Sequence, residues 1–217
     1  MANNMQVLEI TAATRDELYE IAMFLDDCWK TEYSKIVSAD HLNAMAVNER
    51  HKGILSLFDE KLSDFLIMRD AGILVGAAVF GKSFTDGFSG DGEISAIYLQ
   101  HDYIGKGYGH ALFTKTEAAL SEKGFVSFVI DVLSGNTRAI SFYKNHGYKI
   151  VSERSICLGD KEYPLTVLRK RNDRHDFELA NRNFNVIAKP NKPSNGVRVA
   201  MIEHNGAPIE LMEFEGG

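Results

Sequence analysis

A glycine-rich turn is the part of this 217-residue sequence best suited to binding a ligand. Three glycines alternate with other residues in Ile104-Gly105-Lys106-Gly107-Tyr108-Gly109-His110, between a predicted strand and a predicted helix. Glycine lets the backbone approach a ligand closely, and the N-terminal end of the following helix adds positive potential. The turn therefore predicts a site for a phosphate or pyrophosphate, and the alternative is a glycine turn that binds no ligand.

Two common nucleotide-binding motifs do not describe this turn. The dinucleotide-binding motif G-x-G-x-x-G requires a third glycine where His110 stands. It also follows the first strand of its fold, whereas this turn follows the fourth predicted strand. A P-loop ends in Gly-Lys-Ser/Thr, and the turn does not end in that way. A phosphate bound here would therefore be held by another kind of fold.

Hydrophobic periodicity predicts the elements that position the turn. Thr14 and Glu17 form a capping-box pattern that starts an amphipathic helix extending to about Tyr33. Cys28 lies on its apolar face and is interpreted as a core residue. A second helix begins at Ser38 and is expected to break near Gly53. Strands are predicted at Gln6–Ala12, Phe65–Arg69, Ile73–Phe80, Glu93–Leu99, Phe125–Val132, Tyr148–Cys157 and Tyr163–Leu168.

Two further helices lie between the later strands. One follows the glycine turn and stops at Gly124. The other is short, with Asn136 as its N-cap and Gly147 in the C′ position after it. The order of elements predicts an α/β domain over residues 1–171, with a mixed, mainly antiparallel sheet flanked by helices.

The run from Glu93 to Lys170 resembles the core of the GNAT superfamily of N-acyltransferases. The signature of that family is Gln/Arg-x-x-Gly-x-Gly/Ala after the fourth strand, matched here by Gly107 and Gly109. A second motif follows at the family's separation, with Asn136 and then Ser141-Phe142-Tyr143-Lys144-Asn145-His146-Gly147-Tyr148. Ile104 departs from the family's Gln or Arg, which changes a side chain and leaves the backbone amides of the turn in place.

The resemblance implies an acetyl-CoA-dependent N-acetyltransferase with a defined cofactor site. The backbone of Ile97, Tyr98 and Leu99 would pair with the pantetheine amides, as an added strand would. The amides of Gly105, Lys106, Gly107, Tyr108, Gly109 and His110 would hold the pyrophosphate. Asn136 and Tyr143 would lie along the pantetheine arm near the thioester.

The resemblance also implies catalytic roles. Tyr143 would protonate the leaving thiolate, with cofactor packing as its alternative role, and a backbone amide near Leu99 would stabilise the oxyanion. Glu93 is favoured as the general base that deprotonates the amine, and Asp131 is the second candidate. No spacing of histidines suggests a metal site, and His101 and His110 are interpreted as solvated or close to phosphate.

Charge and composition limit the partners. The net charge of −6 argues against a nucleic-acid binder. Residues 1–65 hold 12 acidic and 6 basic side chains, and such a negative field favours a cationic amine as acceptor. The longest apolar run, Ile73 to Gly81, has nine residues, so no membrane span is expected. With no signal peptide at the N-terminus and only two cysteines, we expect a cytoplasmic protein.

The identity of the acceptor stays open at this stage. The segment Leu158-Gly159-Asp160-Lys161-Glu162, followed by Leu165–Arg169, is similar to bacterial polyamine acetyltransferases. Protein N-terminal amines and aminoglycosides are alternatives. A non-catalytic acyl-CoA sensor or interaction module is an alternative of another class.

Residues 172–217 are predicted to form a separate, β-rich extension. Strands are expected at Phe184–Ala188, Val197–Glu203 and Ile209–Phe214, with Asn205-Gly206 as a tight turn. The segment weakly resembles part of a vicinal-oxygen-chelate module, in which Glu210 would occupy a metal-ligand position. Only one incomplete module is present, so we expect an interaction element, such as a homodimer contact, and no metal site.

Overall fold

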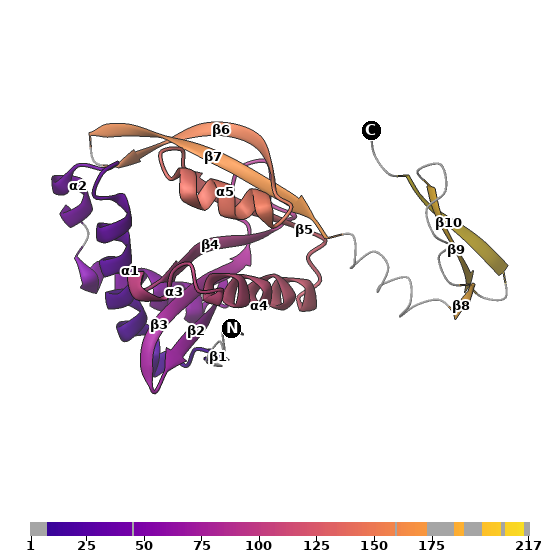
Figure 1. Ribbon diagram of the computed structural model, residues 1–217, viewed down its shortest axis with the longest axis horizontal. Helices are drawn as coiled ribbons and strands as arrows, with labels where there is room; N and C mark the ends of the chain where they lie inside the picture. Colours follow the sequence, from indigo (N-terminus) through magenta and orange to yellow (C-terminus); the bar gives the residue numbers. More distant parts are fainter. Residues whose placement is uncertain are drawn as a thin grey trace, which may run out of the picture. The chain divides into compact units, whose positions relative to one another are not determined.

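The computed structural model describes residues 8–44, 46–158, 160–172, 185–188, 197–204 and 207–214. The chain divides into two compact units, Met1–Arg171 and Asn172–Gly217 (Figure 1). No helix within the described residues is both long and apolar enough to cross a membrane.

The first unit contains a seven-stranded sheet with the strand order β1-β2-β3-β4-β5-β7-β6. Its strands are β1 (Glu9–Ala12), β2 (Ser63–Asp70), β3 (Ile73–Lys82), β4 (Gly92–Leu99), β5 (Ser127–Leu133), β6 (Lys149–Leu158) and β7 (Lys161–Arg171). All neighbouring strands are antiparallel except β4 and β5, which are parallel. The predicted mixed, mainly antiparallel sheet is therefore confirmed.

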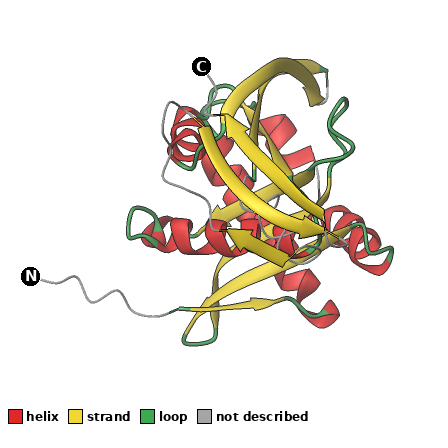
Figure 2. Ribbon diagram, turned by 90° about the vertical axis from the view of Figure 1, so that its right-hand side faces the viewer, coloured by secondary structure: helices red, strands yellow, loops and turns green. Residues whose placement is uncertain are grey.

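Helices lie on both faces of this sheet (Figure 2). The helical elements are η1 (Arg15–Glu17), α1 (Leu18–Tyr33), α2 (Ala39–Ala44), α3 (Val47–Asp59), η2 (His101–Tyr103), α4 (Tyr108–Glu122) and α5 (Thr137–Asn145). The predicted capping box is present, because the Thr14 amide and hydroxyl both donate to Glu17 Oε2 at 2.8 Å. Asn136 caps α5 as predicted, and Gly147 follows that helix with φ of +88°.

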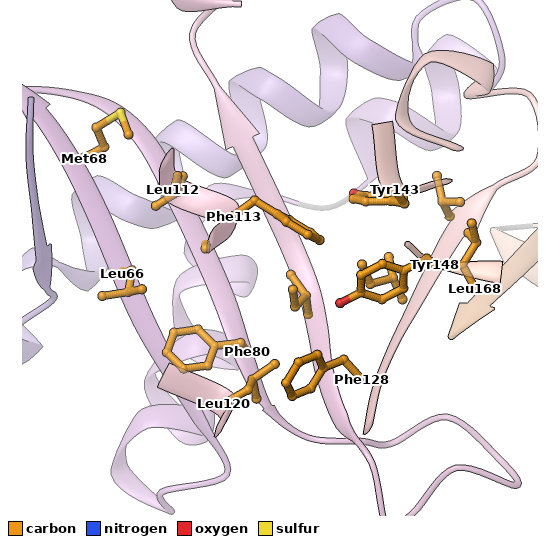
Figure 3. Close-up of a cluster of buried hydrophobic side chains, with 14 of the residues drawn as sticks. Leu66, Met68, Phe80, Leu112, Phe113, Leu120, Phe128, Tyr143, Tyr148 and Leu168 are labelled. Carbon is orange, nitrogen blue, oxygen red and sulfur yellow. The ribbon is translucent and has the colours of Figure 1, made fainter. Parts of the chain in front are cut away.

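The alternation of side chains along the strands separates two cores. Leu66, Phe80 and Phe128 face one side and pack with Leu112 and Phe113 of α4 (Figure 3). The residues between them on the same strands face the other side and pack against α1 and α3; they include Phe65, Ile67, Ala77 and Val79. The period of two in strands therefore places α4 and α5 on one face and α1 and α3 on the other.

The expected break at Gly53 is wrong. Gly53 lies inside α3, and the helical region instead divides into α2, which ends at Ala44, and α3, which begins at Val47. A glycine inside a helix costs about 1 kcal/mol relative to alanine. Burial of Ile54 against α1 and the sheet, together with Leu57 and Phe58 of the same helix, offsets that cost.

The parallel strands β4 and β5 pair over a short distance only. Their register contains two pairs, Gly92 with Phe128 and Glu93 with Val129. A β-bulge at Ser95 follows directly, since Val79 pairs with Ala96 and Phe80 pairs with Ile94. Beyond this point β4 keeps its pairing with β3 but has no strand on its other side. The sheet therefore opens between β4 and β5, and the bulge redirects the strand at the opening.

The second unit contains a three-stranded antiparallel sheet in the order β10-β9-β8. Its strands are β8 (Asn185–Ala188), β9 (Val197–His204) and β10 (Ala207–Phe214). The three predicted strands are confirmed, whereas the predicted turn Asn205-Gly206 lies outside the described residues.

Candidate active site

A cavity of about 510 Å³ occupies the opening between β4 and β5. It is lined by residues 94–99 of β4, residues 130–132 of β5, the glycine turn, one side of α1 and one side of α5. Residues from three distant stretches of the sequence, 24–33, 94–110 and 130–143, therefore meet at the place where the sheet separates.

The glycine turn forms one end of this lining, with Gly105, Gly107 and Gly109 all at the cavity. Gly105 and Gly107 have φ of +77° and +89°, which L side chains rarely adopt. Gly107 is also the N-cap of α4, so the amides that follow it belong to the open end of a helix. A Cβ on Gly109 would lie 3.4 Å from Leu99 Cδ1 and 3.9 Å from Phe142 Cε2.

The sequence predicts that Lys106 and Tyr108 contribute backbone amides to the cofactor site, and their side chains point elsewhere. Tyr108 is buried in the core, with its ring centroid 5.8 Å from that of Tyr103. Lys106 Nζ lies 6.0 Å from the Tyr103 ring centroid, and neither residue lines the cavity. Only their backbone amides remain as candidate phosphate donors.

The expected strand residues Ile97, Tyr98 and Leu99 line the cavity. They lie beyond the last pair between β4 and β5, so the backbone edge that faces β5 is left without a paired strand. Such an edge can form backbone hydrogen bonds with an extended ligand.

Asn136 and Tyr143 reach the cavity from α5. The Asn136 Oδ1 atom accepts from the Ala139 amide at 3.0 Å, which fixes the side chain as the helix cap. Tyr143 is buried, and burial raises the pKa of its hydroxyl above the ordinary range, with further contributions from Tyr33 and Glu32. The hydroxyl of Tyr143 therefore stays protonated at physiological pH.

Tyr33, at the end of α1, is a cavity residue that the sequence did not indicate. It is buried, and burial raises the pKa of its hydroxyl, while hydrogen bonding to Asn136 and Tyr98 opposes that change. Helical spacing marked Tyr33 only as the last residue of a helix, because its partners come from β4 and the cap of α5.

Cys28 also lines the cavity, which its prediction as a simple core residue did not include. Its Sγ atom lies 3.9 Å from the Leu99 carbonyl oxygen. Burial, reinforced by Asp27 and Glu32, raises the pKa of the thiol to about 12. The thiol is therefore protonated and poorly nucleophilic.

The two candidate bases differ in their surroundings. Glu93 is buried but does not line the cavity. Its Oε2 atom accepts from Ser83 Oγ and the Phe84 amide at 2.9 Å, and from the Thr85 amide and hydroxyl at 3.2 Å. Four donors on one oxygen make Glu93 the residue that holds the loop between β3 and β4.

Asp131 lines the cavity from β5. Its Oδ2 atom pairs with Arg154 and accepts from the Thr85 hydroxyl at 3.3 Å. Its Oδ1 atom is buried and has no hydrogen-bond partner in the described part of the chain. A buried carboxylate oxygen without a partner is costly, and a bound donor would remove that cost.

Ion pairs with basic side chains neutralise much of the negative charge of the first 65 residues. Among the carboxylates of that segment, only Asp27 and Glu32 line the cavity. Glu32 Oε2 pairs with Arg138 Nη2 at 2.5 Å, whereas Asp27 has no ion-pair partner within the described residues. The negative field at the site therefore comes from Asp27, with Glu32 and Asp131 partly neutralised by arginines.

Comparison with known proteins identifies the family. Residues 18–148 match the Acetyltransferase (GNAT) family, and this match covers more than half of the chain. The uncharacterized N-acetyltransferase YuaI of Bacillus subtilis is 28% identical over 153 residues, covering 68% of this chain and 83% of YuaI. The uncharacterized N-acetyltransferase Rv2669 of Mycobacterium tuberculosis is 34% identical over 106 residues, covering 47% of this chain and 65% of Rv2669.

Solved structures share the fold. A ribosomal-protein-alanine N-acetyltransferase from Brucella melitensis has a TM-score of 0.60 at 18% identity, covering 76% of this chain and 99% of its own. YncA from Salmonella typhimurium, a putative acetyltransferase solved with acetyl-CoA, also has a TM-score of 0.60 at 18% identity, with coverages of 77% and 95%. The chain belongs to the GNAT acetyltransferase family and is an N-acetyltransferase.

Proposed function

We propose that this enzyme transfers an acetyl group from acetyl-CoA to the primary amine of a small cationic acceptor, in the cytoplasm. The observation that carries the proposal is one cavity that joins a phosphate-binding type of turn, an unpaired strand edge and a buried tyrosine hydroxyl. Two structural neighbours, one solved with coenzyme A and one with acetyl-CoA, support the choice of cosubstrate. Cys28 and Cys157 are free thiols, which suits a reducing compartment.

The cosubstrate fits the residues that line the cavity. A pyrophosphate would be held by the amides from Gly105 to His110, at the open N-terminal end of α4. The missing side chains at Gly105 and Gly109 leave room for it, and Gly107 lines the same cavity. The pantetheine arm would pair with the edge of β4 at residues 97–99, which carries its thioester toward Asn136 and Tyr143.

Acyl transfer from a thioester to an amine requires three things of the protein. The amine must lose a proton, the tetrahedral oxyanion needs a hydrogen-bond donor, and the leaving thiolate benefits from a proton. We assign the last role to Tyr143, a cavity residue whose raised pKa keeps its hydroxyl protonated. A backbone amide of β4 near Leu99 serves as the oxyanion donor.

For the base, the surroundings favour Asp131 over Glu93, which reverses the order expected from the sequence. Asp131 Oδ1 is an unpaired acceptor on a cavity residue, so it can accept a hydrogen bond from an ammonium group and then its proton. Glu93 Oε2 would have to release loop donors to do the same.

The acceptor is assigned from the charge around the cavity. Asp27 is available for a positive group, and Glu32 and Asp131 add to the same field. A polyamine such as spermidine matches this charge, and the likeness of residues 158–169 to polyamine acetyltransferases agrees with it. The test is release of free CoA thiol with polyamines, neutral amines, aminoglycosides and peptides with free N-terminal amines.

We expect kcat/KM for polyamines to exceed that for neutral amines and to fall as salt shortens the Debye length to about 8 Å at 0.15 M. The variant Asp27→Asn should reduce this preference. Preference for a neutral or acidic amine would contradict the cationic acceptor. Binding of acetyl-CoA without release of thiol for any amine would favour a non-catalytic sensor.

The C-terminal unit is proposed as an interaction element that pairs with a second copy of the chain. Its β9 has eight residues and pairs with β8 and β10, so β8 and β10 are the outer strands of its sheet. Glu210 lies on β10, and we propose no metal role for it. Light scattering of the full chain and of residues 1–171 tests this proposal, since an unchanged molecular-mass state would contradict it.

A further inference from the structure

Two histidines form a hydrogen-bonded pair at the phosphate end of the cavity. His110 is the third residue of α4, lines the cavity and is exposed. His146 follows α5 and is half-buried between the rings of Phe113 and Phe142, at centroid distances of 4.7 and 4.2 Å. His110 Nδ1 lies 2.8 Å from His146 Nε2, and His146 Nδ1 lies 2.8 Å from the Phe142 carbonyl oxygen.

These two distances fix the protons of the neutral pair. The Phe142 carbonyl can only accept, so His146 Nδ1 must carry a proton and donate it. In the neutral ring His146 Nε2 is then an acceptor, so His110 Nδ1 must donate to it. A neutral His110 with its proton on Nδ1 has a bare lone pair on Nε2. The neutral pair therefore leaves His110, a cavity residue, with an acceptor and no donor on Nε2.

Adding one proton changes what the pair presents. If the proton is placed on either ring, one hydrogen still lies between His110 Nδ1 and His146 Nε2, and His110 Nε2 becomes an N–H donor. A second added proton would put hydrogens on both facing nitrogens and break the contact. The pair can therefore hold one extra proton, and only in that state can His110 donate to an anion.

We propose that the His110–His146 pair binds the pyrophosphate of acetyl-CoA through the His110 Nε2–H group, and that binding takes up one proton from solvent. This inference rests on the proposed function, because it requires acetyl-CoA in the cavity. His110 acts as a binding residue beyond its backbone amide, and His146 acts as a positioning residue that sets its protonation state.

The surroundings of the pair combine two helix ends and several charged side chains. His110 lies at the N-terminal end of α4, which carries positive potential, and His146 lies at the C-terminal end of α5, which carries negative potential. The described ion pair of a histidine with a carboxylate involves His41, so neither member of this pair has one. The other titratable or charged side chains on the neighbouring elements include His101, Tyr103, Lys106, Tyr108, Lys115, Glu117, Glu122, Arg138, Tyr143, Lys144, Tyr148 and Lys170. Among these, Glu117 pairs with Lys170, and Arg138 pairs with Glu32.

Thermodynamic linkage between proton binding and acetyl-CoA binding gives the direction in which the affinity changes with pH. Because the anion stabilises the protonated pair, binding is strongest at low pH and weakens as the pH rises through the range where the bound pair loses its proton. Where the free pair is neutral and the bound pair is protonated, the Kd of acetyl-CoA should rise by up to about tenfold per pH unit, the limit for uptake of one proton.

The test is calorimetric titration of acetyl-CoA at pH 7.0, 7.5 and 8.0 in buffers with different ionisation enthalpies, which measures the protons taken up. A second probe, acetyl-3′-dephospho-CoA, keeps the pyrophosphate and lacks the monoester whose own pKa is about 6. Uptake approaching one proton with both probes is expected. Binding with no uptake overturns the inference and leaves the proposed function intact, whereas absence of binding overturns both.

Variants distinguish a proton-linked binding role of the His110–His146 pair from a purely structural role. His146→Phe keeps a ring between Phe113 and Phe142 but frees His110 to carry its proton on Nε2. It should bind acetyl-CoA with no proton uptake and a Kd that is independent of pH in this range. His51→Gln, on α3 and away from the cavity, is the matched control and should keep the uptake.

A measurement without ligand tests the same geometry. Long-range proton–nitrogen NMR at pH 8 should find both His110 and His146 protonated on Nδ1. A proton on Nε2 of either ring would overturn the inference, even if the fold and the activity were intact.

Discussion

Replacing Tyr143 by phenylalanine tests the chemical step most directly. The substitution removes one oxygen and keeps the ring, which packs 5.7 Å from Phe113 and 6.3 Å from Tyr148 between centroids. The fold should therefore change little. General acid catalysis contributes about 10²–10⁴-fold to a rate. Since burial raises the pKa of Tyr143 above its ordinary value, the hydroxyl is a weaker acid, and a loss near 10²-fold in kcat is expected.

The affinity for acetyl-CoA should respond far less than kcat. A lost hydroxyl contact is worth about 0.5–1.5 kcal/mol, or roughly 2- to 13-fold in Kd. The pH profile gives a second measure, because a raised pKa keeps the acid protonated above the ordinary tyrosine value of about 10. The kcat of the wild type should therefore show no loss of activity from tyrosine ionisation up to pH 10.

The assay is steady-state thiol release at saturating acceptor, with a matched control. Tyr148→Phe removes a hydroxyl from the same ring cluster, but Tyr148 does not line the cavity, so its kcat should match the wild type. If Tyr143→Phe kept a near-normal kcat and raised only KM for acetyl-CoA, Tyr143 would be a cofactor-positioning residue. A fall in activity below pH 10 that the Tyr143→Phe variant lacks would contradict the argument from burial.

Three further predictions follow from the same geometry. Asp131→Asn should lower kcat by about 10²–10⁴-fold. Glu93→Gln should keep kcat but lose about 1.5–3 kcal/mol of stability in chemical denaturation, as expected for hydrogen bonds to a charged group. A large loss of kcat in Glu93→Gln, with little loss in Asp131→Asn, would restore Glu93 as the base. Gly109→Val should abolish acetyl-CoA binding, measured by calorimetry. The variant should stay folded by circular dichroism, since its Cβ has only an ordinary contact with Leu99. Unchanged affinity would place the pyrophosphate elsewhere. Gly53→Ala should raise the free energy of unfolding by about 0.8–1.0 kcal/mol, because no atom lies within 4 Å of the new methyl group, and a decrease would show strain in α3.

The sequence by itself determined most of the elements and the position of the glycine turn. Period-two and helical patterns located the strands and most helices, since local sterics and one-sided burial act within a few residues. The Thr14 capping box and the Asn136 cap are local hydrogen bonds, and both are present in the structure. The glycines of the turn indicated a site lined by backbone, because glycine readily adopts the φ values of +77° and +89° found at Gly105 and Gly107.

Tertiary structure decided which side chains serve the site. The sequence favoured Glu93 over Asp131 as the base, but the partners that distinguish the two carboxylates come from the loop after β3 and from β6. Tyr33 joins the cavity only because α1 ends beside β4 and α5.

The His110–His146 hydrogen bond is also a feature that tertiary structure decides and the sequence alone does not. It links residues 36 positions apart, which no periodicity connects. The sequence could place each histidine next to a helix end, but the 2.8 Å contact that fixes their protons depends on how α4 and α5 pack together. Local patterns are set by interactions within a few residues, whereas hydrogen-bond partners and charge state are set by elements that meet only when the chain folds.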